Sequence, residues 1–336
     1  MGPLNRVDLS DRPPLVLPYR PPWWLPGGHL QTIYPSLFAP APQVAYRRER
    51  WDAPDGDFID ADWIDGASPT APLVVLFHGL EGSSHSHYAR SVMGEARRRG
   101  WQGMVAHFRG CSGEPNRRPR AYHSGDSDEI DWILRRARAA RPGVPLYAAG
   151  ISLGGNALAK WAGERGESAR FVTAAAAVGA PLDLAAGGHA LARGFNRLYT
   201  RWFLLTMKRK ATEKYARFPE LARGGARARA LGARTLFEFD DAFTAPLHGF
   251  RDATDYWSRA SGRPWLAAVT LPLLVLNSVN DPFVPAASLP TAADVSRSVV
   301  LDRPENGGHI GFAQGPFPGA LEYLPQRLFA FFATGA

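Results

Sequence analysis

Between residues 72 and 182 the chain alternates short, uninterrupted apolar runs with longer segments that are apolar on one face only. Uninterrupted apolar runs are typical of parallel strands buried on both faces, and segments of helical period between them predict crossover helices. The strands are expected at Pro72–Phe77, Gly103–His107, Leu146–Ala149 and Phe171–Val178, with helices at Tyr88–Arg99, Gly125–Ala140 and Asn156–Arg165. The pattern therefore predicts an α/β fold around a mostly parallel sheet with helices on both faces.

The flanking segments extend this sheet in both directions. Upstream, apolar and polar residues alternate near Val44–Trp51 and near Phe58–Trp63, and the turn residues Pro54–Asp57 lie between the two segments. This pattern predicts a β-hairpin. Downstream we expect strands at Pro272–Leu276 and Ser298–Leu301, a helix starting at Ala286 between them, and a terminal helix near Gly319–Phe332. The core of the fold is accordingly assigned to residues 45–182 and 269–336.

Two segments do not follow the strand–helix pattern. Residues 1–44 are rich in proline and aromatic residues, and we expect an extended strap with no regular helix. Between the strands at Phe171–Val178 and Pro272–Leu276 lie about 90 residues, where a crossover helix with its loops needs roughly a third of that length. We expect residues 183–268 to form an inserted helical cap over the strand ends, with its basic clusters solvated.

Composition and charge narrow the class of protein. The chain has 336 residues, 45% of them hydrophobic and 21% charged, as in globular proteins, and its net charge is +8. The basic residues are scattered and follow no groove or recognition-helix pattern, so nucleic acid is not an expected partner, whereas peripheral membrane contact stays open.

The sequence contains no secretory or membrane-spanning signal. The N-terminus lacks a continuous apolar stretch of the kind that secretory signals carry. The longest run of low polarity, Phe171–Leu182, is too short to span a bilayer. The single cysteine, Cys111, excludes an intramolecular disulfide and suits a reducing compartment. We expect a cytoplasmic protein.

The candidate chemistry begins at Ser152, in the segment Gly150–Gly154. A serine flanked by glycines between a predicted strand and a predicted helix is typical of a nucleophile elbow, a turn so tight that the hydroxyl stands above the sheet. Glycine is needed on both sides because a Cβ there would collide across the turn. Ser152 is therefore the candidate nucleophile.

A serine hydroxyl needs a base, and the base needs an anion to orient it. On elbow folds these follow the serine in the order acid, then histidine. Asp281 follows the strand at Pro272–Leu276, and His309 follows the strand at Ser298–Leu301, so both are expected at the edge of the sheet that carries Ser152. Asp183 is the main rival acid, whereas Asp126 suits the start of a helix and is expected to cap it.

Acyl transfer also needs N–H donors for the developing oxyanion. The backbone amides of Leu80, which follows His78-Gly79 at the end of an early strand, and of Leu153, which follows the nucleophile, are the candidates. We interpret His78 as a structural hydrogen-bonding residue and Glu81 as an ion-pair partner. Cys111 has no adjacent base in the sequence and is interpreted as a small loop residue.

The sequence implies no cofactor and no metal. It has neither a glycine-rich dinucleotide turn nor a phosphate loop. The run His85-Ser86-His87 lacks further ligands at zinc-like spacing.

Several further motifs make the chain similar to a known family. It resembles the α/β-hydrolase superfamily, within it the YheT-like branch that includes eukaryotic abhydrolase-domain esterases and phospholipases. The resemblance spans nearly the whole chain, at Gly27–Thr32, His78–Ser84, Phe108–Gly113, Tyr122–Asp126, Gly150–Gly155, Asn280–Phe283 and Gly307–His309. It implies the α/β-hydrolase fold and hydrolysis of carboxylic esters, either short-chain esters or acylglycerol-type lipids, with Ser152, Asp281 and His309 as a catalytic triad.

We therefore expect a serine esterase that acts on a small-molecule ester or lipid substrate through an acyl-enzyme on Ser152. Two alternatives stay open at this point. The same triad would serve an alcohol acyltransferase, and an idle hydrolase fold would serve as a binding protein.

Overall fold

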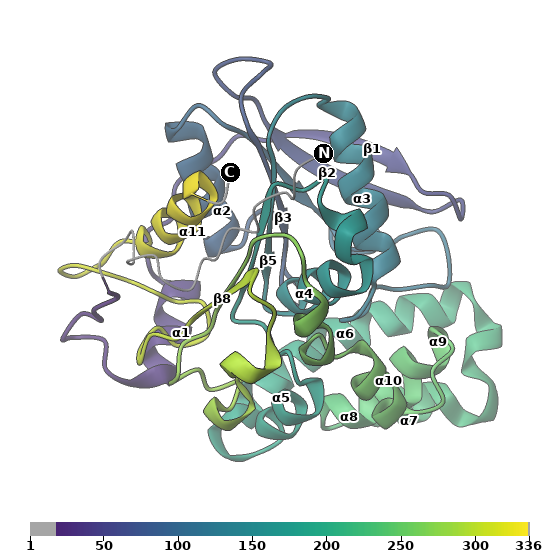
Figure 1. Ribbon diagram of the computed structural model, residues 1–336. Coiled ribbons are helices and arrows are strands. Elements are labelled where there is room, and N and C mark those ends of the chain that lie inside the picture. The colour runs from purple at the N-terminus through teal and green to yellow at the C-terminus, as the bar shows by residue number, and fades with distance from the viewer. Residues whose placement is uncertain (1–17, 335–336) are drawn as a thin grey trace.

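An eight-stranded sheet runs through the centre of the computed structural model, which describes residues 18–334 (Figure 1). Its strands lie in the order β1-β2-β4-β3-β5-β6-β7-β8. Their bounds are β1 (Arg47–Asp52), β2 (Phe58–Ile64), β3 (Leu73–Phe77), β4 (Gln102–Ala106), β5 (Leu146–Ile151), β6 (Ala174–Val178), β7 (Leu273–Leu276) and β8 (Val299–Asp302). The strands from β4 to β8 pair in parallel, whereas β2 pairs antiparallel with both β1 and β4. The predicted fold class, a mostly parallel sheet extended by a hairpin, is confirmed.

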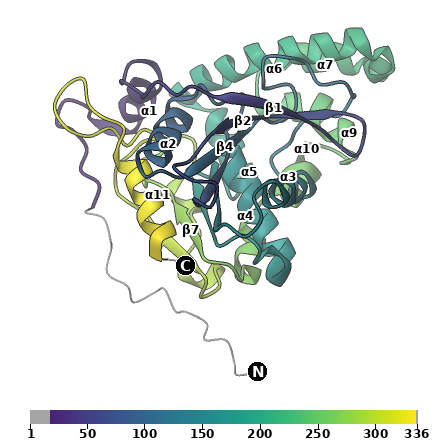
Figure 2. The ribbon, with the colours of Figure 1, turned by 90° about the horizontal axis from the view of Figure 1, so that it is seen from above.

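Helices cover both faces of the sheet, as the uninterrupted apolar strands require (Figure 2). Leu73, Val75 and Phe77 of β3 belong to the apolar cluster that includes α3 (Ser127–Ala140) and α4 (Leu153–Arg165). The intervening Val74 and Leu76 belong to the cluster on the other face, with α2 (His87–Arg98) and α11 (Tyr323–Thr334). Alternate side chains of one strand thus enter two separate cores.

A group of helices connects β6 to β7 and lies beyond one end of the sheet (Figure 1). These helices are α5 (Leu184–Leu191), α6 (Arg197–Arg217), α7 (Ala226–Gly232), α8 (Leu236–Phe239), α9 (Ala245–Leu247) and α10 (Ala253–Ala260). They have a small core of their own, formed around Leu204, Tyr215, Phe239 and Phe243. This core lets the connection keep its shape over the strand ends.

The expectation of a helix-free strap in residues 1–44 is wrong, because Gly27–Leu37 forms helix α1. The prolines that exclude a helix lie mostly before it, and Pro26 stands at its N-cap. Pro35 falls in its last turn. The part of the expected strap before residue 18 lies outside the described residues.

The helix expected from Ala286 is also absent. The connection between β7 and β8 contains only two short 3-10 turns, Ala286–Ser288 and Ala292–Asp294. Pro290 provides the reason, since a proline after the first turn of a helix lacks the N–H donor and clashes with the preceding turn.

Backbone contact between α1 and the loops at the end of the sheet depends on glycine. A Cβ at Gly28 would lie 1.9 Å from the carbonyl oxygen of Asn280, and one at Gly311 would lie 1.7 Å from that of Gln31.

We predict that Gly28→Ala lowers the free energy of unfolding by about 2–4 kcal/mol, because α1 has to move off the loop. Chemical denaturation would measure this loss.

Gly232 is the matched control, since a Cβ there would meet nothing within 4 Å. Gly232→Ala should leave stability unchanged or raise it by up to about 1 kcal/mol. Equal effects of the two substitutions would contradict the close approach at Gly28.

Candidate active site

Ser152 occupies a strained turn between β5 and α4. Its φ of 53° and ψ of −117° are unusual for a residue with a side chain. A Cβ at Gly150 would lie 2.4 Å from the carbonyl oxygen of Gly154, and one at Gly154 would lie 2.6 Å from those of Phe77 and His78. Both flanking glycines are therefore required by sterics, and the turn presents the Ser152 hydroxyl at the end of the sheet.

The structure brings Ser152, His309 and Asp281 together from three separate segments. The Nε2 atom of His309 lies 2.9 Å from the Ser152 Oγ, and its Nδ1 atom lies 2.8 Å from the Asp281 Oδ2. Asp281 follows β7, and His309 follows β8. The Asp281 side chain is fully buried, and its Oδ1 accepts hydrogen bonds from the backbone N–H groups of Phe283 and Val284. The carboxylate is thus fixed in position while it faces the imidazole.

The two rival acids cap helices. The Asp183 side chain accepts a hydrogen bond from the N–H of Ala186 at the start of α5. The Asp126 side chain accepts one from the N–H of Glu129 at the start of α3, as expected from the sequence.

The loop after β3 lies against Ser152, since a Cβ at Gly79 would lie 3.2 Å from the Ser152 Cβ. The N–H of Gly79 donates to the hydroxyl of Tyr88 (2.9 Å), and the N–H of Glu81 donates to the hydroxyl of Tyr122 (3.0 Å). Between them, the N–H of Leu80 has no acceptor within the described part of the chain, and the same is true of Leu153. Two unengaged donors therefore flank the serine.

His78 has the structural role that its position suggests. It is fully buried, its Nδ1–H donates to the carbonyl oxygen of Gly79 (2.7 Å), and its Nε2 accepts from the N–H of Phe108 (3.0 Å). Burial lowers the pKa of His78 to about 3, so the ring stays neutral. It joins the ends of β3 and β4 below the loop that carries Leu80.

Helix α1 holds the His309 loop, a role that sequence reasoning missed. The Oγ1 of Thr32 accepts from the N–H of His309 (2.8 Å). The Oε1 of Gln31 accepts from the N–H of Gly307 (2.8 Å) and from the Nδ2 of Asn280 (2.9 Å). Gln31 and Thr32 belong to the segment that carries part of the family resemblance, and this was the signal available.

A cavity of about 590 Å³ opens beside Ser152 and His309. Leu80 and Leu153 line it close to the serine, and side chains from the helices between β6 and β7 form its far wall. One part of that wall is apolar: Leu184, Leu191, Phe203, Met207, Leu236, Phe239, Phe243 and Trp257. Another part is polar, because α6 also contributes Arg209, Lys210, Glu213, Lys214 and Arg217.

With this geometry in view, the comparisons with known proteins decide the family. Residues 72–316 match the family model described as the alpha/beta hydrolase fold. The chain belongs to the α/β-hydrolase fold family. It is 38% identical to the Escherichia coli protein YheT over 302 residues, which cover 89% of this chain and 88% of YheT. It is 29% identical to human phospholipase ABHD3 over 327 residues, which cover 95% of this chain and 79% of that protein. The YheT-like resemblance is confirmed.

Solved structures agree on the fold. An esterase from Pyrococcus furiosus superposes with a TM-score of 0.54 at 18% identity, covering 88% of this chain and 97% of its own. Among residues 18–334 of this α/β-hydrolase fold protein, no helix is long and apolar enough to cross a membrane.

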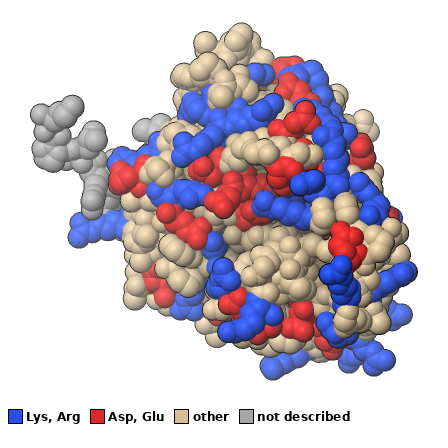
Figure 3. Space-filling model, turned by 90° about the vertical axis from the view of Figure 1, so that its right-hand side faces the viewer, with Lys and Arg blue, Asp and Glu red and all other residues tan. Residues whose placement is uncertain are grey.

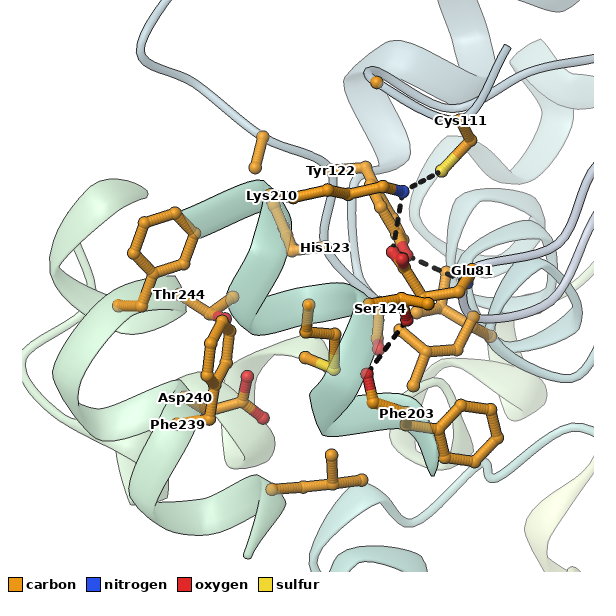
Figure 4. A pocket seen from close by; sticks show the side chains of 18 of the residues that line it. Glu81, Cys111, Tyr122, His123, Ser124, Phe203, Lys210, Phe239, Asp240 and Thr244 are labelled. Carbon is orange, nitrogen blue, oxygen red and sulfur yellow. Dashed lines mark hydrogen bonds and ion pairs between the residues drawn. The ribbon is translucent and has the colours of Figure 1, made fainter. Parts of the chain in front are cut away.

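One side of the cavity contains a polar network that joins α6 to the loop with Leu80 (Figure 4). The Nζ of Lys210 donates to the Oε1 of Glu81 (2.8 Å) and contacts the Sγ of Cys111 (3.2 Å). The hydroxyl of Tyr122 donates to the same carboxylate (2.7 Å). Glu81 is thus in an ion pair, as expected. Cys111 and Lys210 differ from expectation, because a basic side chain lies beside the thiol and the Lys210 side chain is only 26% exposed. Burial raises the pKa of Cys111 to about 11.

A second polar side chain, Asp240, lies in the apolar wall of the cavity (Figure 4). It begins a π-helical segment, Asp240–Thr244, between α8 and α9. Its Oδ2 accepts from the Nε1 of Trp257 (2.8 Å), and burial raises its pKa to about 6. At neutral pH the fold therefore carries an ionised carboxylate in surroundings that favour its protonated form.

This raised pKa predicts a pH-dependent effect of Asp240→Asn. The carboxyl keeps its proton in the folded state up to about pH 6, whereas in the unfolded chain it loses the proton near pH 4. The free energy of unfolding of the wild type therefore falls as the pH rises from 4 to 6. Asparagine cannot ionise and can still accept the Trp257 hydrogen bond. The variant should gain up to about 3 kcal/mol relative to wild type between pH 4 and pH 8, measured by denaturant unfolding.

Asp241 at the next position is exposed, so Asp241→Asn is the control and should show no comparable gain. A stability difference between Asp240→Asn and wild type that stays constant with pH would contradict the prediction.

Proposed function

We propose that the protein hydrolyses carboxylic esters through an acyl-enzyme on Ser152. The observation that carries the proposal is the position of the His309 imidazole, which contacts the Ser152 hydroxyl with one nitrogen and the Asp281 carboxylate with the other. A serine, histidine and aspartate in this arrangement have the geometry of a proton relay that activates the serine.

In the proposed reaction, the Ser152 Oγ attacks the ester carbonyl carbon while the His309 Nε2 takes the hydroxyl proton. Asp281 keeps the Nδ1 proton of His309 in place and stabilises the imidazolium that forms. His309 then gives the proton to the oxygen of the leaving alcohol, and the C–O bond of the ester breaks. Water, activated by the same imidazole, attacks the acyl-enzyme and releases the carboxylic acid.

The amides of Leu80 and Leu153 are proposed to bind the oxyanion of each tetrahedral intermediate. Neither donor has a protein acceptor among residues 18–334, and both residues line the cavity beside Ser152. Donors fixed in advance need no reorganisation as charge develops, so they stabilise the transition state more than the substrate.

The shape and chemistry of the cavity support an ester with an apolar acyl chain. Part of its far wall is formed by aliphatic and aromatic side chains, and the related human protein is named a phospholipase. We propose short-chain esters or acylglycerol-type lipids as the substrate class, residues 183–268 as the cap that shapes the acyl site, and the segment 1–44 as a strap whose helix α1 supports His309.

Ser152→Ala tests the nucleophile. Without the Oγ no acyl-enzyme can form, so kcat for a p-nitrophenyl ester should fall by about 10⁴–10⁶ while substrate binding stays nearly intact. A fluorophosphonate probe should label wild type and not the variant. Loss of less than tenfold in kcat, or labelling that persists in the variant, would count against Ser152 and favour a binding role for the fold.

Thr32→Val tests whether α1 positions the histidine. Valine keeps the shape of the side chain but leaves the N–H of His309 without its acceptor, so the imidazole should lose its alignment. We expect kcat to fall by about tenfold to a hundredfold with KM little changed. The matched control is Ser36→Ala, which removes an exposed hydroxyl from the same helix and should leave both constants unchanged. If Thr32→Val raised KM and left kcat unchanged, a positioning role would be contradicted.

A further inference from the structure

Helix α6 has three rows of side chains with three different surroundings. One row, with Leu204, Ala211 and Tyr215, is buried in the core of the helices between β6 and β7. A second row, with Phe203, Met207 and Lys210, lines the cavity. The third row is apolar yet faces solvent, with Leu198 56%, Trp202 69% and Leu205 63% exposed. Spacings of four and three residues place these three side chains on one face of the helix.

The exposed row continues onto α1. The His29 ring lies 4.6 Å from that of Phe195, and its Nδ1 lies 3.1 Å from the hydroxyl of Tyr199. Phe195 and Leu30 are themselves half exposed. We use the name α1–α6 surface for the exposed side chains Leu30, Phe195, Leu198, Trp202 and Leu205. Figure 2 shows α1 and α6 along the same edge of the molecule. Single exposed apolar residues are ordinary on a protein surface, but a group of five large exposed apolar side chains on two neighbouring helices indicates a binding surface.

The charged residues next to the exposed row of α6 in the sequence are arginines. Arg193, Arg197 and Arg201 are exposed, and none has a carboxylate partner within the described residues. Residues 18–48 and 184–212, which supply α1 and most of α6, contain no Asp or Glu. The one acidic residue of α6, Glu213, lines the cavity. By contrast, the face turned to the viewer in Figure 3 intersperses acidic with basic side chains. Apolar side chains together with unpaired arginines are the chemistry that an anionic lipid surface attracts.

We propose that the α1–α6 surface docks on a bilayer that contains anionic phospholipid. Leu198, Trp202 and Leu205 enter the interfacial layer, and the arginines contact lipid phosphates while their aliphatic stems cover apolar surface. A second copy of the chain is a poorer occupant, because two such surfaces would bring arginines against arginines with no acidic residue from these segments between them.

The same helix connects this surface to the reaction. Because α6 carries the exposed row on one side and cavity-lining residues on another, docking would place the cavity wall next to the lipid. This consequence rests on the proposed ester hydrolysis with lipid substrates, whereas docking itself does not require catalysis.

Vesicle flotation of the full chain tests the proposal, with Ser152→Ala as the background so that lipid is not consumed. The protein should float with vesicles of phosphatidylcholine and phosphatidylglycerol, and much less with phosphatidylcholine alone. Adding Leu198→Ser, Trp202→Ser and Leu205→Ser should weaken partitioning by at least about tenfold. None of these three residues lines the cavity. The same triple variant with Ser152 intact should therefore hydrolyse a soluble p-nitrophenyl ester within about twofold of wild type, which also shows that it folds.

Two pairs of charge-removing substitutions test which arginines contribute to vesicle binding. Arg197→Gln with Arg201→Gln should reduce flotation, whereas Arg223→Gln with Arg227→Gln, which removes the same charge from exposed positions beyond the other end of α6, should not. Equal losses in both pairs would mean attraction by net charge alone and would overturn the assignment of this surface. Absence of flotation would also overturn it, as would a dimer in sedimentation velocity that the triple variant abolishes. Soluble-ester hydrolysis without flotation would reject docking and leave the proposed function intact.

Discussion

The His309 imidazole must meet two partners at once, one on each ring nitrogen, and those partners lie 28 and 157 residues away in the sequence. A parallel sheet satisfies this requirement because it brings the carboxyl ends of its strands to one edge. Ser152 follows β5, Asp281 follows β7 and His309 follows β8, so each residue needs only a short loop to reach the others. The cost is local strain, which the fold concentrates at Ser152 with its positive φ and at the glycines that allow backbones to approach closely.

The strands and the three candidate catalytic residues could be predicted from sequence because their signals are local. Apolar runs define β3 to β8, and a serine between glycines defines the elbow. Helix α1 was missed because its neighbours are proline-rich, although Gly27–Thr32 itself contains no proline. The support that Gln31 and Thr32 give to residues 307–309 involves sequence separations of more than 270 residues, so no local pattern could reveal it.

Other features depend on tertiary surroundings in the same way. The sequence shows Cys111 without an adjacent base, yet α6 places Lys210 beside its thiol. Asp240 looks like an ordinary helical acid until burial in the cavity wall raises its pKa to about 6. The helices between β6 and β7 thus do more than cover the strand ends. Lys210 and Asp240 add charged groups to the cavity, and Trp202 belongs to an apolar face that points outward.

The central claim is that the Ser152 hydroxyl reacts while the Leu80 and Leu153 amides hold the oxygen that becomes negative. A crystal structure of the protein inactivated with an alkyl phosphonate ester tests it most directly, because the tetrahedral phosphorus imitates the intermediate. The account predicts a covalent bond from phosphorus to the Ser152 Oγ, the phosphonyl oxygen within hydrogen-bond distance of both amides, and the alkyl chain against Phe203 and Trp257. Attachment to another residue, or a phosphonyl oxygen turned away from both amides, would contradict it.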